Sequence, residues 1–178
     1  MRRILCLLAL IALAAVWAWP QNSRAIVEVR PVLAADGAHP DSTIKAAVVA
    51  QIATGFHIND HKPTLDYLIP TELEFQSHRQ VSTLKVVYPP GKLKPFTFSE
   101  RPLSVYEGAF TVGARLKISP TASPGIYTLR GKLKYQACND HACSPPASVP
   151  VTFSLKVVSP RTPLKRLNGE IFNGVQLN

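Results

Sequence analysis

Apolar and polar residues alternate along three long segments of this chain, and that alternation limits what the chain can form. In residues 108–118 every second side chain is apolar, and these side chains share one face of an extended strand: Phe110, Val112, Ala114, Leu116 and Ile118. Residues 127–137 and 149–157 repeat the pattern. A period of two is typical of a strand with one face in the core and the other in water. The three segments therefore predict half-buried β-strands.

Shorter runs with strand-like composition lie before and between these segments, at residues 26–33, 44–53, 71–75 and 83–88. Turn-forming residues separate the runs, and the chain has 16 prolines. A long apolar stripe at helical spacing does not occur after residue 25. The pattern predicts an all-β fold, an immunoglobulin-like β-sandwich over residues 26–158. Antibody-type domains have a tryptophan between two cysteines within the sandwich. This chain lacks that pattern, because both tryptophans, Trp17 and Trp19, lie near the N-terminus.

The N-terminus has the pattern of a secretory signal peptide. Two arginines precede an apolar run over residues 4–19, and Ser23 and Ala25 then have the small-residue spacing of a processing site. We predict a signal peptide over residues 1–25 and therefore a periplasmic or secreted protein. The alternative is an uncleaved anchor formed by residues 4–19, because this run is only slightly shorter than the ~20 residues that a membrane-spanning helix needs. The protein would contact a membrane only in that case.

The charge of the chain is basic but dispersed. Lysine and arginine number 20 against 11 acidic residues, which gives a formal charge of +9. The basic residues are scattered, without a long run or interleaved aromatic residues, so we predict no nucleic-acid binding and interpret them as a solvated surface. Residues 159–178 lose the alternation, and we predict a basic, loosely ordered tail there.

The stretch YQACNDHACSPP, residues 135–146, holds a close cysteine pair. Without the signal peptide, Cys138 and Cys143 are the remaining cysteines, and such a pair in an exported chain predicts a disulfide. The strand before it and the strand that starts near Val149 should form a hairpin, with both cysteines in the loop. A bond that closes so short a loop constrains the unfolded chain little. An exposed pair at a sandwich end would suit thiol–disulfide exchange, yet these residues alone leave a structural role equally open.

Two other functions compete with exchange. Cys138, His141 and Cys143 lie within six residues and suit a soft ion, copper or zinc, provided that the thiols are reduced. His57 and His61 form a second histidine pair, but they flank a turn signal rather than share a helix face. The remaining alternative is a non-catalytic binding sandwich with a structural disulfide.

The cysteine stretch resembles the active-site segment of the N-terminal periplasmic domain of the disulfide reductase DsbD. The matching residues are Tyr135, Gln136, Cys138, Cys143, Pro145 and Pro146. Upstream segments that begin at residues 55, 68, 86 and 103 follow in the family's order, so the resemblance covers roughly residues 26–158. It implies a domain without a cofactor that relays reducing equivalents from a membrane electron carrier to thioredoxin-like partners. The chain would then be one component of a thiol:disulfide oxidoreductase system.

The resemblance also implies roles for single residues. Cys143 would exchange with partners and Cys138 would resolve the mixed disulfide. A cap loop over residues 92–101 would shield the bond, with Phe96 or Phe98 as the aromatic cap. Well-known family members carry carboxylates in this loop, whereas this chain has these residues: Lys92, Lys94 and Pro95, with Glu100 close by. Basic neighbours would favour the thiolate over the thiol.

Overall fold

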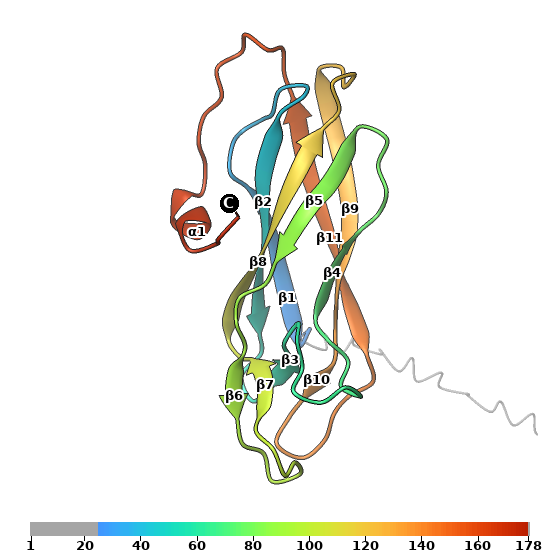
Figure 1. Ribbon diagram of the computed structural model, residues 1–178, viewed down its shortest axis with the longest axis vertical. Coiled ribbons are helices and arrows are strands. Elements are labelled where there is room, and N and C mark those ends of the chain that lie inside the picture. Colours follow the sequence, from blue (N-terminus) through green and yellow to red (C-terminus); the bar gives the residue numbers. More distant parts are fainter. Residues whose placement is uncertain (1–24, 178) are drawn as a thin grey trace, which may run out of the picture.

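The computed structural model describes residues 25–177. These residues form a β-sandwich that carries a smaller sheet at one end (Figure 1). The predicted signal peptide and the predicted anchor fall, apart from Ala25, outside the described residues. Between residues 25 and 177 no helix is long and apolar enough to cross a membrane.

The two sheets of the sandwich are antiparallel, and the all-β prediction is confirmed. The first has the strand order β1–β2–β8–β5, with bounds Val27–Leu33, Thr43–Ile52, Ala109–Ile118 and Val81–Val87. The second has the order β11–β9–β4, with bounds Ala147–Val157, Gly125–Tyr135 and Glu72–Phe75. The five apolar residues that alternate along β8 are all buried, as the period of two predicts.

The core of the protein lies between these two sheets. Val48 and Val112 from the first sheet and Leu133 and Leu155 from the second have no exposed surface. Burying an aliphatic side chain of this size stabilises the fold by about 1.5–3 kcal/mol. Both sheets therefore depend on the same core, and neither strand layer is independent of the other.

A smaller sheet, called the end sheet below, lies at the lower end of the molecule in Figure 1. Its strand order is β10–β3–β7–β6, with bounds Ala137–Cys138, His57–Asn59, Leu103–Tyr106 and Lys92–Lys94. β3 follows β2, β7 precedes β8 and β10 follows β9, so long strands of the sandwich run on into the end sheet. The sequence pattern did not predict these strands, because two to four residues are too few to show a period.

Two glycines make the passage from the first sheet to the end sheet possible. Gly55 lies between β2 and β3 with φ 84°, and Gly108 lies between β7 and β8 with φ 63°. Residues with a side chain rarely adopt this left-handed conformation. The chain turns at these two glycines, and β3 and β7 then pair with each other, with Ile58 opposite Tyr106.

The prediction of a loosely ordered tail after residue 158 is wrong. The tail runs back along the first sheet: Lys165 and Asp36 exchange hydrogen bonds, the N–H of Leu167 donates to the carbonyl of Ala34, and the chain then forms helix α1 (Gly169–Asn173). Leu177 is 1% exposed and lies over Gly113 of β8, where an added Cβ would meet its side chain. Backbone hydrogen bonds and the contact of Leu177 over Gly113 hold this segment in place. Neither interaction requires an alternating pattern in the sequence.

We expect Leu177→Ala to lower the free energy of unfolding by about 2 kcal/mol. This is the low end of the range for buried leucines, because a terminal segment can undock without opening the core. Urea denaturation measures the effect, with Leu164→Ala as the matched control, since Leu164 lies in the same tail but is 36% exposed. Equal stabilities of the two variants would show that the tail does not contribute to the fold.

Candidate functional site

The cysteine stretch begins where β9 leaves its hairpin partner. The predicted hairpin is present, and its ladder ends at the pair Tyr135 and Ala147. After Gln136 the chain changes sheets, and Cys138 pairs with His57 on β3. Cys138 therefore lies on a strand of the end sheet and not in the hairpin loop, which corrects the predicted placement. The change was not visible in the sequence, because the partner strand lies about 80 residues away along the chain.

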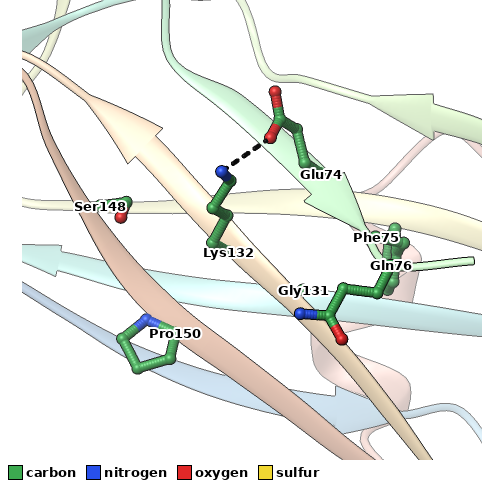
Figure 2. Close-up of a pocket in the computed structure, with 7 residues that line it drawn as sticks. All are labelled: Glu74, Phe75, Gln76, Gly131, Lys132, Ser148 and Pro150. Atoms are coloured by element: carbon green, nitrogen blue, oxygen red, sulfur yellow. Dashed lines mark ion pairs between the residues drawn. The ribbon is translucent and has the colours of Figure 1, made fainter.

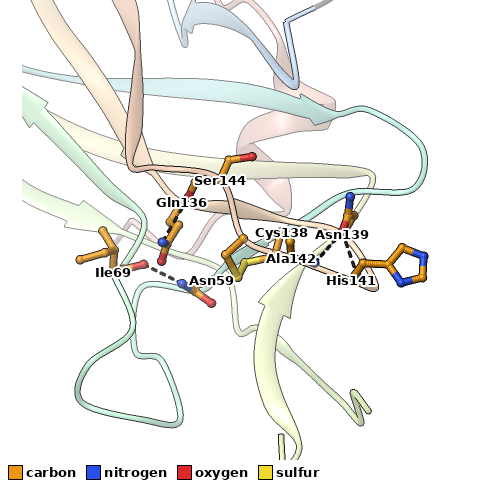
Figure 3. Close-up of a disulfide and its surroundings, with 9 residues drawn as sticks. Asn59, Ile69, Gln136, Cys138, Asn139, His141, Ala142 and Ser144 are labelled. Atoms are coloured by element: carbon orange, nitrogen blue, oxygen red, sulfur yellow. Dashed lines mark hydrogen bonds between the residues drawn. A yellow bond between two sulfur atoms is a disulfide. The ribbon is translucent and has the colours of Figure 1, made fainter. Parts of the chain in front are cut away.

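The disulfide joins Cys138 to Cys143 (Figure 3). Between them the loop is held by its own hydrogen bonds: the Asn139 side-chain oxygen accepts from the N–H groups of His141 and Ala142, at 2.9 and 2.8 Å. The N–H of Ser144 also donates to the carbonyl of Ala137 at 2.8 Å. None of these bonds involves sulfur. We therefore expect the loop to keep its shape when the disulfide opens.

The two sulfur-bearing residues differ sharply in exposure. Cys138 is 2% exposed, whereas Cys143 lies on the exposed side of the loop. A partner can thus approach Cys143, while the strand pairing of Cys138 with β3 keeps Cys138 covered. This asymmetry is what exchange chemistry requires of an attacked and a leaving sulfur, because access determines which sulfur is attacked.

The end sheet has two different faces. Ile58 and Ala137 point into the core of the sandwich. Side chains alternate along a strand, and directly paired residues share a face. His57 and Cys138 therefore lie together on the opposite face, away from the core and towards the loop between β6 and β7.

Phe96 covers that opposite face. Its ring is 8% exposed and packs with Leu103 and Val105 of β7, in a small hydrophobic cluster separate from the main core. It stacks on the imidazole of His57 with 4.2 Å between ring centroids. Phe98 stacks on the outer side of Phe96 at 5.1 Å but is 46% exposed. Of the two candidates for the cap, Phe96 is the one that contacts the strand neighbour of Cys138.

His57 is the site residue whose position the sequence did not predict. Its side chain is 2% exposed, and its Nε2 atom has no hydrogen-bond partner. Burial lowers the pKa of the imidazole below its ordinary value of 6.5, against the opposing field of Glu107. The ring is therefore neutral near pH 7. The available signal was a histidine within a short apolar stretch, GFHIND, but it gave no hint of which strand His57 would meet.

We expect the burial of His57 to make stability depend on pH. The unfolded chain binds a proton at His57 near pH 6.5 and the folded chain does so only at lower pH, so stability is fully present above about pH 6.5 and falls as the pH drops towards the folded value. His57→Phe should remove this part of the slope. Urea unfolding of both proteins at pH 7.5, 6.5 and 5.5 measures it. An unchanged slope in the variant would mean that His57 is not the group responsible.

Charged groups near the site largely compensate one another. The ammonium of Lys94 forms an ion pair with Glu107 at 2.5 Å, and this hydrogen bond raises the pKa of Lys94. Its Nζ also lies 5.5 Å from the centroid of the Phe96 ring. The predicted field of Lys94 on the thiols is thus reduced by its partner. Both side chains are about 40% exposed, so the pair itself adds little stability.

The metal alternative needs reduced thiols, whereas Cys138 and Cys143 are joined in a disulfide, with His141 in the same loop. His57 stacks on Phe96, and His61 stacks on Tyr88 with 3.7 Å between ring centroids. His141 lies on the exposed loop. Over residues 25–177 no group of three or more histidine, cysteine, aspartate or glutamate side chains could hold a metal ion. The geometry therefore gives no support to a copper or zinc centre.

A hollow elsewhere on the protein does not involve the cysteine pair. It lies over β4, β9 and β11, and Figure 2 shows its lining: Glu74, Phe75, Gln76, Gly131, Lys132, Ser148 and Pro150. Lys132 and Glu74 form an ion pair across it at 3.3 Å. The lining includes neither cysteine nor histidine, so the cysteine pair remains the candidate functional site.

Fold and site together define a class of protein: a β-sandwich domain whose end sheet carries a disulfide between a buried and an exposed cysteine. The model of the family described as "Thiol:disulfide interchange protein DsbD, N-terminal" matches residues 26–154. The chain belongs to this family of DsbD N-terminal domains. The resemblance inferred from the cysteine stretch is thereby confirmed.

Two solved structures are similar to this chain, and the likeness to the first of them supports the fold. The N-terminal periplasmic domain of ScsB from Proteus mirabilis has 16% identity and a TM-score of 0.50, over 78% of this chain and 48% of that chain. The reduced DsbD N-terminal domain of Neisseria meningitidis has 16% identity and a TM-score of 0.45, over 79% and 90%. A search of curated protein sequences found no match.

Proposed function

We propose that this protein is an exported thiol–disulfide exchange domain that relays reducing equivalents through Cys138 and Cys143, to or from thioredoxin-like partners. The observation that carries the proposal is the unequal exposure of the two cysteines, on a loop whose hydrogen bonds do not depend on the disulfide. Membership of the DsbD N-terminal family supports it. A membrane electron carrier of the DsbD type would complete the relay, with the domain in the periplasm.

The exchange follows from the geometry of the two sulfurs. The thiolate of a reduced partner attacks Cys143 Sγ, the bond between the two cysteines breaks, and its electron pair leaves on Cys138 Sγ. The partner is now joined to Cys143 in a mixed disulfide. The partner's second thiol loses its proton to water and attacks the partner's first sulfur, which releases Cys143 as a thiolate and the partner as a disulfide. Two electrons have passed to the cysteine pair, and the reverse sequence returns them.

The reduction potential of the cysteine pair tests this proposal against a structural role. Equilibration in graded thiol buffers, followed by alkylation and mass measurement, gives the potential. We expect about −180 to −270 mV, the range of known exchange proteins, because the loop does not need the bond. A potential below about −300 mV would mark a structural disulfide and would favour a non-catalytic binding sandwich.

We propose that Phe96 is the cap of this pair. In a Cys143→Ala background, Phe96→Ala should speed alkylation of the remaining thiol, Cys138, about tenfold, because removal of the ring uncovers the face on which Cys138 lies and access limits the rate. Phe98→Ala is the matched control: it removes a ring of the same size that is half exposed and stacks only on the outer side. The rate of iodoacetamide incorporation at pH 8 measures the effect. A larger effect at Phe98 would reverse the assignment.

A further inference from the structure

The imidazole of His57 occupies an unusual position for a buried polar side chain. It lies opposite Cys138 on the neighbouring strand, with both side chains on the same face of the end sheet. Phe96 stacks on the ring at 4.2 Å and keeps water from that side. Nε2 is buried without a partner, although a buried polar atom without one destabilises a fold. The oxidised protein thus retains a feature that is unfavourable in that state.

The reduced protein contains an acceptor that the oxidised protein lacks. A disulfide sulfur accepts hydrogen bonds weakly, whereas a thiolate carries a full negative charge and accepts strongly. When the disulfide opens, Cys138 becomes that thiolate, in a buried position where water cannot easily solvate it. Burial alone would raise the pKa of the Cys138 thiol and make it a poor leaving group. A donor beside it would offset that effect.

The charged groups around His57 are poorly suited to donate to a Cys138 thiolate. The neutral imidazole ring of His57 is therefore the donor. The charged groups that act on the ring come from three elements: Lys94 of β6, Glu107 of the turn between β7 and β8, and Asp140 of the cysteine loop. Lys94 and Glu107 are paired with each other. Asp140 disfavours a thiolate, so it cannot substitute for a hydrogen-bond donor.

We propose that the Nε2–H of His57 donates a hydrogen bond to the Sγ of Cys138 when the disulfide opens, and so stabilises Cys138 as the leaving and resolving thiolate. His57 is then a positioning residue that acts only on the reduced form. The proposal rests on the proposed function for its biological use, but the hydrogen bond can be tested without any partner.

The first test is the pKa of Cys138 as a single thiol. In the Cys143→Ala background, absorbance at 240 nm between pH 5 and pH 11 follows formation of the thiolate. His57→Phe keeps the stack on Phe96 and removes the donor, so it should raise the pKa of Cys138 by about one unit, a tenfold loss of thiolate. His57→Gln, which retains an N–H donor, should restore most of the difference. His61→Phe, at the histidine that stacks on Tyr88, should change nothing.

The second test separates the hydrogen bond from a packing effect. The reduction potentials of the wild type and His57→Phe should coincide at a pH well below the Cys138 pKa values found in the first test, where the thiol is protonated in both proteins. They should diverge towards pH 9.5 by up to tenfold in the equilibrium constant, about 30 mV, with the variant more reducing. A packing defect would shift the potential equally at both pH values. Thermal unfolding of the oxidised chain should show His57→Phe at least as stable as the wild type near pH 7.5, since it removes an unpartnered buried nitrogen.

The possible outcomes distinguish the two proposals. An unchanged pKa of Cys138 in His57→Phe, or a potential shift that does not depend on pH, would overturn the role of His57 while leaving exchange intact. A raised pKa together with a reduction potential below about −300 mV would retain the hydrogen bond and overturn the exchange function.

Discussion

The Cys138→Ser variant will accumulate as a mixed disulfide through Cys143, and the Cys143→Ser variant will not. Cys143 lies on the exposed side of the loop, whereas Cys138 is 2% exposed and paired with β3. With Cys138 removed, no neighbouring thiol can displace a partner from Cys143. With Cys143 removed, the remaining thiol is covered, and we expect its rate to be lower by about 100-fold, because exchange rates depend on access to the sulfur.

An excess of glutathione disulfide at pH 8 is a suitable probe, with products counted by mass after acid quenching. The wild type should end as the intramolecular disulfide, because Cys138 displaces glutathione from Cys143. A thioredoxin that keeps only its attacking cysteine, supplied as its mixed disulfide with glutathione, then tests the proposed partner class, because a second thioredoxin thiol would release Cys143 again. Equal rates of glutathionylation at the two single cysteines would overturn the assigned roles. Circular dichroism of both variants provides the control that the sandwich remains folded.

Replacing Leu133 with alanine will lower the free energy of unfolding by about 3–5 kcal/mol, the upper part of the range for buried leucines. Leu133 has no exposed surface and lies in the middle strand of its sheet, between Leu73 of β4 and Val149 of β11. The cavity left behind is bordered by strands on both sides and by the facing sheet, so little of it can collapse. Urea denaturation of the oxidised protein measures the effect.

Two comparisons make this measurement informative. Ile126→Ala changes another aliphatic residue of β9 that is 73% exposed, and it should cost less than about 0.5 kcal/mol. Reduction of the disulfide should cost only about 2 kcal/mol, since the bond closes a loop with a sequence separation of 5 residues. If reduction destabilised the protein more than Leu133→Ala, the bond would be a structural staple after all.

The features that the sequence predicts correctly are those that depend on patterns among neighbouring residues. The alternation from Phe110 to Ile118 predicted β8 and its buried face, because the side-chain period of a strand is visible in any extended segment. The order of residues in YQACNDHACSPP identified the family, since six of its residues match a known active-site segment. Both features lie within a dozen consecutive residues.

The parts that were predicted wrongly or not at all depend on contacts between distant segments. The tail was predicted to be loosely ordered, yet Leu177 docks over Gly113 of β8. Cys138 was placed in a loop, yet it pairs with His57 on a strand of only three residues. A short strand or a docked tail forms only when its partner surface exists, so its own sequence carries almost no signal.

The sequence by itself determined that this protein is a β-sandwich with a cysteine pair, because alternation and motif order are properties of neighbouring residues. Only the tertiary structure decided what surrounds that pair: which cysteine is exposed, that Phe96 stacks on His57, and that His57, whose Nε2 has no partner, pairs with Cys138 across the end sheet. The physical reason is that burial and hydrogen-bond partners are set by the packing of β3, β7 and β10 into one sheet, and these strands come from separate parts of the chain.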